Sequence, residues 1–151
     1  MTLAAPPQAP APQDAAEMAK IANRIRRDVI RMVHAAGCGH PGGPLGLAEI
    51  FATLYFQELR LDPENSEHPL RDRLILSNGH CCAVLYSSLA RRGFFPVEKL
   101  HTFRKFGSPL QGHPHRGALP GIEMSTGSLG NGVSVAAGMA LAAKMDRLDS
   151  R

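Results

Sequence analysis

Three histidines lie in glycine- and proline-rich stretches of the sequence. His40 is in a GHPGG stretch, His80 ends an LSNGH stretch, and His113 is in a QGHP stretch. Imidazole donates or accepts a proton near neutral pH, and its protonated form binds phosphate oxygens. A lone histidine is usually a surface or core residue, but three histidines in turns can share one cleft. The pattern therefore indicates a site for proton transfer on an anionic ligand.

His80 has the surroundings that best suit a phosphate. Leu74–Ser77 is a short apolar run with charged residues before it and Asn-Gly after it, which predicts a buried strand. The apolar spacing after that turn predicts a helix that ends at Gly93. A helix N-terminus offers free N–H groups and a partial positive charge, so this arrangement favours a phosphate beside His80.

A long helix is predicted before the first of these turns. Apolar residues recur at steps of three and four from Met18 to Ala36. Asp14 and Glu17 form a helix-starting capping pair, and Gly37 is suited to end the helix. We expect one amphipathic helix whose basic side faces solvent.

The remainder of the chain is expected to alternate helices with irregular segments. We predict a loop over 37–46, a helix from Leu47 to Tyr55, a short helix from Pro96 to about Phe106, a long loop from Gly107 to Gly121, and a helix from Val133 to about Leu148. Glycine inside a helix costs about 1 kcal/mol relative to alanine, so Gly138 is predicted to mark a tight contact. The last helix needs a partner layer that one strand cannot supply, so we expect a domain cut within its fold.

Composition is typical of a soluble globular domain. The chain has 151 residues, 44% of them hydrophobic, and no run of about 18 apolar residues that could span a membrane. The net charge is +4, but tryptophan is absent and aromatic residues make up 5%, which is weak support for nucleic-acid binding. Cys81 and Cys82 are adjacent and the cysteines number three, so no disulfide framework is expected. Residues 1–13, rich in alanine and proline, resemble neither a secretion signal nor a transit peptide, and we expect a disordered tail on a cytoplasmic protein.

Two common site motifs do not fit the sequence. Gly37, Gly39 and Gly42 have the GxGxxG spacing of dinucleotide sites, but a helix rather than a strand precedes them, so we reject a Rossmann site. The cysteines and histidines of 38–40 and 80–82 lack the spacing that lets zinc ligands converge. We therefore predict no metal ligand in this chain.

Four stretches occur in the order seen in the N-terminal region of transketolases. They are GHPGG (39–43), LSNGH (76–80), QGHP (111–114) and LPGIEMSTGSLGNG (119–132). Together they are strongly specific, and from about Asp14 to Asp149 the chain resembles the N-terminal subunit of split transketolases. A sister family, 1-deoxyxylulose-5-phosphate synthase, fits the third and fourth stretches less well.

The resemblance implies an α/β thiamine diphosphate-binding fold with an incomplete doubly wound parallel sheet flanked by helices. Residues 14–151 would form the N-terminal part of the diphosphate-binding domain, truncated before its metal motif. The implied reaction moves a two-carbon ketol unit from a ketose phosphate to an aldose phosphate, with thiamine diphosphate as cofactor.

The resemblance also implies a role for each site residue. His80 corresponds to a histidine that binds the cofactor diphosphate, which agrees with its predicted place at a helix start. His40 and His113 correspond to catalytic histidines of the substrate channel, which bind the donor's hydroxyl and carbonyl groups and assist proton movement. The other cofactor-binding positions, beside the aminopyrimidine, are Gly127, Ser128 and Leu129.

The sequence departs from the family pattern at two positions, and it lacks the family's metal ligands and activating glutamate. Asn78 stands where lysine is common, and Asn131 where glutamine is common. In the family, the ligands of Mg2+ or Ca2+ and the glutamate that activates the cofactor lie outside the part that this chain resembles. We therefore expect an oligomer with a C-terminal transketolase subunit, sugar phosphate substrates, no nucleic-acid or membrane partner, and no turnover by the chain alone. A non-catalytic remnant that only binds a partner is the alternative.

Overall fold

The computed structural model describes residues 5–151, whose regular elements are all helical. In chain order these elements are α1 (Ala15–Ala36), α2 (Gly42–Gly46), α3 (Ala48–Thr53), η1 (Leu54–Glu58), η2 (Pro63–Asn65), η3 (Gly79–Cys81), α4 (Cys82–Arg92), η4 (Val97–Thr102) and α5 (Asn131–Met145). Residues 5–13 of the expected tail have no regular secondary structure, and residues 1–4 lie outside the described residues.

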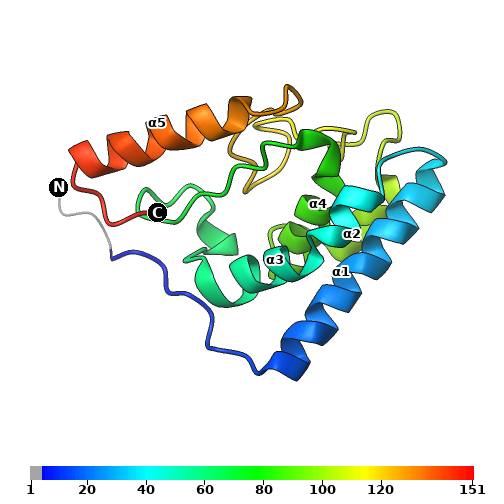
Figure 1. Ribbon diagram of the computed structural model, residues 1–151, viewed down its shortest axis with the longest axis horizontal. Coiled ribbons are helices and arrows are strands. Elements are labelled where there is room, and N and C mark those ends of the chain that lie inside the picture. The colour runs from blue at the N-terminus through cyan, green and yellow to red at the C-terminus, as the bar shows by residue number, and fades with distance from the viewer. Residues whose placement is uncertain (1–4) are drawn as a thin grey trace.

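Helix α1 forms one long edge of the structure, as Figure 1 shows. The carboxylate of Asp14 accepts a hydrogen bond of 2.7 Å from the backbone N–H of Glu17. At the other end, Gly37 adopts a left-handed φ of +64°, and its N–H donates to the carbonyl of His34. Both predicted helix signals are therefore confirmed. The buried apolar side chains of the helix are Ile21, Ala22, Ile25, Val29 and Met32.

The core lies where α1 packs against α3 and α4. Every residue of α4 from Cys82 to Ala90 is buried, so this helix is surrounded by other elements. Asp28 of α1 accepts hydrogen bonds from the Ser87 hydroxyl at 2.7 Å and from Nη2 of Arg91 at 2.8 Å. These polar contacts fix the rotation of α4 against α1, and α4 in turn follows the turn that carries His80.

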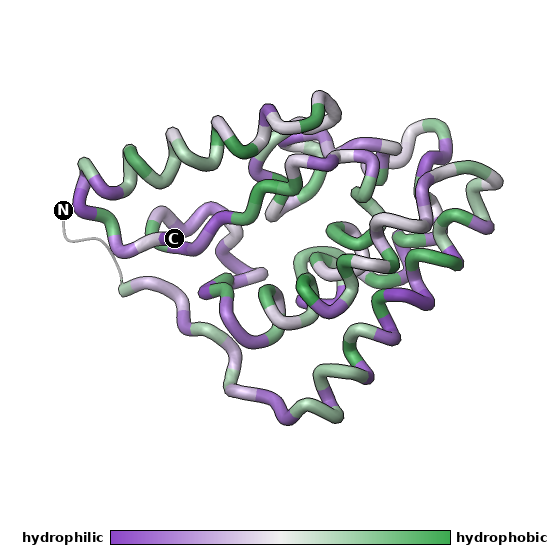
Figure 2. The backbone as a smooth tube through the Cα atoms, in the orientation of Figure 1, coloured by the Kyte–Doolittle hydropathy of each residue, from purple (hydrophilic) through white to green (hydrophobic). Residues whose placement is uncertain are grey.

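The strand predicted at Leu74–Ser77 is not formed as part of a sheet. This segment is extended, and Figure 2 shows its hydrophobic residues following a hydrophilic stretch. A strand needs a ladder of backbone hydrogen bonds to a neighbour. Next to the segment, the Arg73 N–H donates to the carbonyl of Arg151 at 2.8 Å, and residues 5–151 contain no β-strand. The predicted parallel sheet is thus not confirmed within the described residues.

Three other predictions of local structure need correction. The segment 37–46 is not all loop, because Gly42–Gly46 forms α2. The short helix expected up to Phe106 is the 3-10 helix η4, which ends at Thr102. A Cβ placed at Gly138 would meet no atom within 4 Å, so residues 5–151 do not form the tight contact predicted there.

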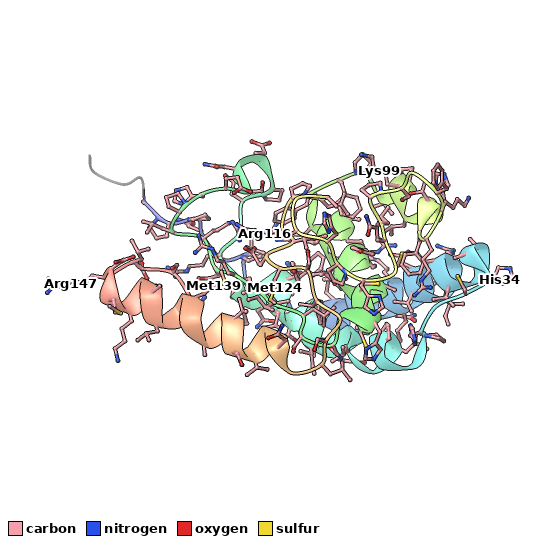
Figure 3. The ribbon with its side chains drawn as sticks, turned by 90° about the horizontal axis from the view of Figure 1, so that it is seen from above. His34, Lys99, Arg116, Met124, Met139 and Arg147 are labelled. Atoms are coloured by element: carbon pink, nitrogen blue, oxygen red, sulfur yellow. The ribbon has the colours of Figure 1, made fainter. Side chains whose placement is uncertain are left out.

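Helix α5 lies apart from the helices of the core, as Figure 1 shows. Its start packs closely on the extended segment, since a Cβ at Gly132 would lie 2.8 Å from the Cα of Ser77. Beyond that point its large apolar side chains are exposed, including Val133 at 66% and Met145 at 73%. A cavity of about 540 Å³ between α5 and the loops is lined by Arg116, Met124 and Met139 among others, which Figure 3 labels.

No helix within residues 5–151 combines the length and the apolar character needed to cross a membrane.

Candidate functional site

Two of the predicted site histidines are in direct contact. The ring centroids of His40 and His80 are 5.3 Å apart, with an angle of 69° between the ring planes. His40 comes from the turn after α1, and His80 from η3 at the start of α4. The contact depends on a close approach of these two segments, because a Cβ at Gly43 would lie 2.4 Å from the sulfur of Cys81.

His113 belongs to the same cluster. Desolvation lowers the pKa of His113 below its ordinary value, and the charges of Arg104, His40 and His80 lower it further. Its ring carbon Cδ2 lies 3.4 Å from the position of a Cβ on Gly127. The three histidines predicted to share one cleft are therefore brought together, with Gly127 beside them.

Helix α4 holds the loop that carries His113. The hydroxyl of Tyr86 donates to the carbonyl oxygens of Gln111 at 2.9 Å and His113 at 3.2 Å. The thiol of Cys82 donates to the carbonyl of Gly112 at 3.2 Å. Burial raises the pKa of Cys82 to about 12 and raises the pKa of Tyr86 even more, so both groups keep their protons near neutral pH. One buried helix thus positions His113 and directly follows His80.

The turn that carries His80 packs against the segment that leads to Gly127. A Cβ at Gly79 would lie 2.4 Å from the carbonyl oxygen of Thr126, so only glycine permits this approach. The sequence motifs LSNGH and STGSLGNG are therefore neighbours in space, although about 45 residues separate them along the chain.

The remaining predicted site residues lie in the turn before α5. Ser128 and Leu129 are exposed, and the Leu129 side chain retains 68% of its accessible surface. The carbonyl of Ser128 accepts the N–H of Asn131, which closes the turn. The structure places Gly127 at the histidines, and these two residues follow it along the chain.

Two buried hydroxyl groups lie near the histidine cluster. Within residues 5–151, the buried hydroxyl oxygens of Ser77 and Thr126 have no hydrogen-bond partner. Thr126 packs against Gly79, in the turn of His80. Ser77, which packs against Gly132, precedes the same turn in the chain. Buried polar atoms are almost always hydrogen-bonded in proteins. Two such hydroxyls beside a histidine cluster fit a ligand with several phosphate oxygens.

A metal site in the described residues would need several ligands close together. Residues 5–151 contain no group of three or more histidine, cysteine, aspartate or glutamate side chains that could hold a metal ion. The three cysteines are free, with Cys38 exposed and Cys81 and Cys82 buried.

Sequence reasoning missed Arg104. Its charge acts on both Cys82 and His113, and its guanidinium packs against Gly112. No motif singled out this arginine, because its place depends on a loop that folds back on itself. The sequence signal that could have revealed it is the glycine directly before His113.

Comparisons with known proteins agree with this arrangement. The family model described as the thiamine diphosphate binding domain of transketolase matches residues 17–149. A 6-deoxy-6-sulfo-D-fructose transketolase subunit from a Clostridium species is 46% identical over 127 residues, which cover 84% of this chain and 46% of that subunit. A transketolase from Kluyveromyces lactis is 50% identical over 119 residues, which cover 78% of this chain and 17% of that enzyme.

A solved structure gives the same answer. A transketolase mutant from Pichia stipitis matches with a TM-score of 0.81 and 43% identity, covering 85% of this chain and 19% of the other. The chain therefore spans less than half the length of these relatives. The relatives are transketolases, so the comparisons do not favour the synthase or nucleic-acid alternatives. On both sequence and fold, the chain belongs to the transketolase family, as part of its thiamine diphosphate-binding domain.

Proposed function

We propose that this chain is the N-terminal part of a transketolase that moves a two-carbon ketol unit from a ketose phosphate to an aldose phosphate. The observation that carries the proposal is the cluster of His40, His80 and His113 beside Gly127. Each of these residues comes from a different motif of the family. Their convergence in one place supports a shared ligand.

In this proposal, His80 and its neighbours hold the diphosphate of thiamine diphosphate. The unpartnered hydroxyls of Ser77 and Thr126 offer hydrogen bonds close to that turn. Gly127, Ser128 and Leu129 would contact the aminopyrimidine. When bound, thiamine diphosphate would supply the nucleophilic carbon that the ketol transfer needs.

His40 and His113 then bind the hydroxyl and carbonyl groups of the sugar and move protons. The lowered pKa of His113 favours its neutral form, which can accept a proton from a substrate hydroxyl. His40 is exposed and in contact with His80, so it can reach a sugar bound next to the cofactor. In this proposal, His80 binds the cofactor diphosphate, and His40 and His113 bind the sugar.

We propose that activity requires a partner subunit with the pyrimidine-binding domain. A relative that is itself described as a transketolase subunit exceeds this chain in length, and α5 exposes apolar side chains that a further layer could cover. Ligands for Mg2+ or Ca2+ and the activating glutamate would come from outside this chain. The assembly would be a cytoplasmic oligomer, and the chain alone would show no turnover.

The test is a chimera in which residues 17–149 replace the matched region of an active transketolase. We expect the chimera to bind thiamine diphosphate in the presence of Mg2+ and to transfer a ketol unit. His80→Ala should weaken cofactor binding at least about tenfold, the effect of losing one charge-assisted hydrogen bond. His101→Ala, which removes an exposed histidine of η4, is the matched control and should leave the affinity unchanged. Equal affinities of the His80→Ala and parent chimeras would contradict the assigned role.

A further inference from the structure

Arg104 lies between the two loops that carry the sugar-binding histidines. Its guanidinium packs on Gly112, where a Cβ would lie 2.7 Å from both Cζ and Nη2. Gly112 has no left-handed φ, and the atoms that a Cβ would meet here belong to the guanidinium end of Arg104 and not to backbone. Any side chain at this position, next to His113, would displace the arginine.

The other side of Arg104 faces the loop of His40. Its Nη1 donates to the sulfur of Cys38 at 3.7 Å, two residues before His40. Phe103 extends the same contact, because a Cβ at Gly39 would lie 3.5 Å from its Cε1 atom. The arginine and its neighbour therefore touch both loops.

The backbone around Arg104 is fixed in an unusual conformation. Its φ is +58°, a left-handed value that residues with a side chain rarely adopt. The Arg104 N–H donates to the carbonyl of Leu110 at 2.8 Å, which closes the loop that leads to His113. Such conformations persist where the surrounding contacts demand them.

In the described part of the chain, no carboxylate neutralises the charge of Arg104. Within residues 5–151 no salt bridge involves this arginine, and its buried Nε has no hydrogen-bond partner. The groups whose charge acts on His113 are Arg104, His40 and His80. Arg104 is the only permanent cation among these three, because guanidinium does not lose its proton in proteins.

We infer that Arg104 is a positioning residue for the histidine cluster, in which its guanidinium joins the loop of His40 to the loop of His113. It fixes the loop of His113 beside Gly127, and its positive charge adds to desolvation in favouring the neutral form of the His113 ring. The inference rests on the proposed role of the histidines in binding and proton transfer. Arg104 itself acts through His113.

The test is an NMR titration of the histidine rings in the full chain, without cofactor, for the parent, Arg104→Gln and Arg104→Lys. Arg104→Gln should move the His113 titration to higher pH and weaken the nuclear Overhauser contact between His113 and Gly127. Arg104→Lys, which keeps the charge, should restore the titration towards that of the parent. Lys105→Gln removes a cation from the adjacent exposed position and should leave His113 unchanged.

A second variant removes the packing and keeps the charge. Gly112→Ala should push the guanidinium aside and weaken the contact between His113 and Gly127. An unchanged ring signal of buried His68 would show that each variant is folded. The inference is overturned if His113 titrates as in the parent in both Arg104 variants, or if Gly112→Ala leaves its contact with Gly127 intact. Because no cofactor is present, these results do not depend on the cofactor affinity that tests the proposed function.

Discussion

The rings of His40 and His80 meet edge to face, with their centroids 5.3 Å apart, although 39 residues separate them in the chain. Neither histidine is in a long regular element. Their contact is set by glycines that let the turn after α1 approach the start of α4. The geometry of the site therefore depends on a few close backbone approaches and on the buried helix behind them.

Removing the hydroxyl of Tyr86 should loosen the loop of His113. Tyr86→Phe leaves the carbonyls of Gln111 and His113 without this buried donor, so we expect a loss of about 1–3 kcal/mol in unfolding free energy. Tyr55→Phe is the comparison, because Tyr55 is almost as buried as Tyr86 but belongs to η1 and not to the helix that holds the loop of His113. Urea unfolding of the two variants checks the difference. Equal losses would show that the hydrogen bonds of Tyr86 do not stabilise the loop.

The glycine before His80 should not tolerate a side chain. Gly79→Ala would place a methyl group 2.4 Å from the carbonyl oxygen of Thr126, and we expect about 1–3 kcal/mol of destabilisation from overpacking. Gly138→Ala is the contrasting variant, because it adds a methyl group in open space within α5. It should stabilise the chain by about 0.5–1 kcal/mol through helix propensity. Thermal unfolding measures both changes, and a stabilised Gly79→Ala variant would contradict the close approach.

The same Gly138→Ala variant tests whether α5 packs against a further layer in the assembled protein. If a further layer packs on α5 in the assembled protein, the added methyl group should weaken assembly while it stabilises the isolated chain. Analytical ultracentrifugation of the chimera with and without the substitution measures this effect.

Breaking the contact between α1 and α4 should destabilise the whole chain. Asp28 is buried and binds both Ser87 and Arg91, so Asp28→Ala leaves an uncompensated guanidinium and should cost about 3 kcal/mol. The exposed pair of Arg26 and Glu49 provides the comparison, and Glu49→Ala should cost less than about 1 kcal/mol. Chemical denaturation distinguishes the two. A small effect at Asp28 would mean that apolar packing alone aligns these helices.

Stability should fall at acid pH because of Asp72. Burial alone would raise the pKa of this carboxyl, but hydrogen bonds from Arg60 and Arg151 hold it below its ordinary value of 3.8. A lowered folded-state pKa adds stability above the unfolded-state pKa, and that stability is lost as the pH falls through the folded-state value. We therefore expect unfolding free energy to decline below about pH 4.

Asp72→Asn should remove this part of the pH dependence and lower stability at neutral pH. Asp146→Asn, at an exposed position after α5, should keep the acid-dependent loss. Unfolding measured from about pH 6 to about pH 2 tests both variants. Identical acid curves for Asp72→Asn and the parent would assign the loss to other carboxyl groups.

Local signals predicted part of the structure well. The Asp14 cap, the apolar spacing of α1 and the left-handed Gly37 are short-range features, and each one formed as expected. The grouping of the histidines was predicted from their place in turns and from the family motifs. The contacts of Arg104 could not be predicted, because they join Cys38, Gly112 and Leu110 through the folded loop.

The predicted sheet shows the other limit of sequence reasoning. The apolar run Leu74–Ser77 predicted a buried strand, but no strand forms there within the described residues, because an isolated run does not contain its hydrogen-bonding neighbours.

The different exposure of the three cysteines has a practical consequence. Cys38 is open to solvent, whereas Cys81 and Cys82 are enclosed, and burial raises the pKa of both enclosed thiols. An alkylating dye should therefore modify Cys38 alone in the native chain. That attachment point lies two residues from His40, so a fluorophore placed there can report ligand occupancy directly, without any engineered thiol.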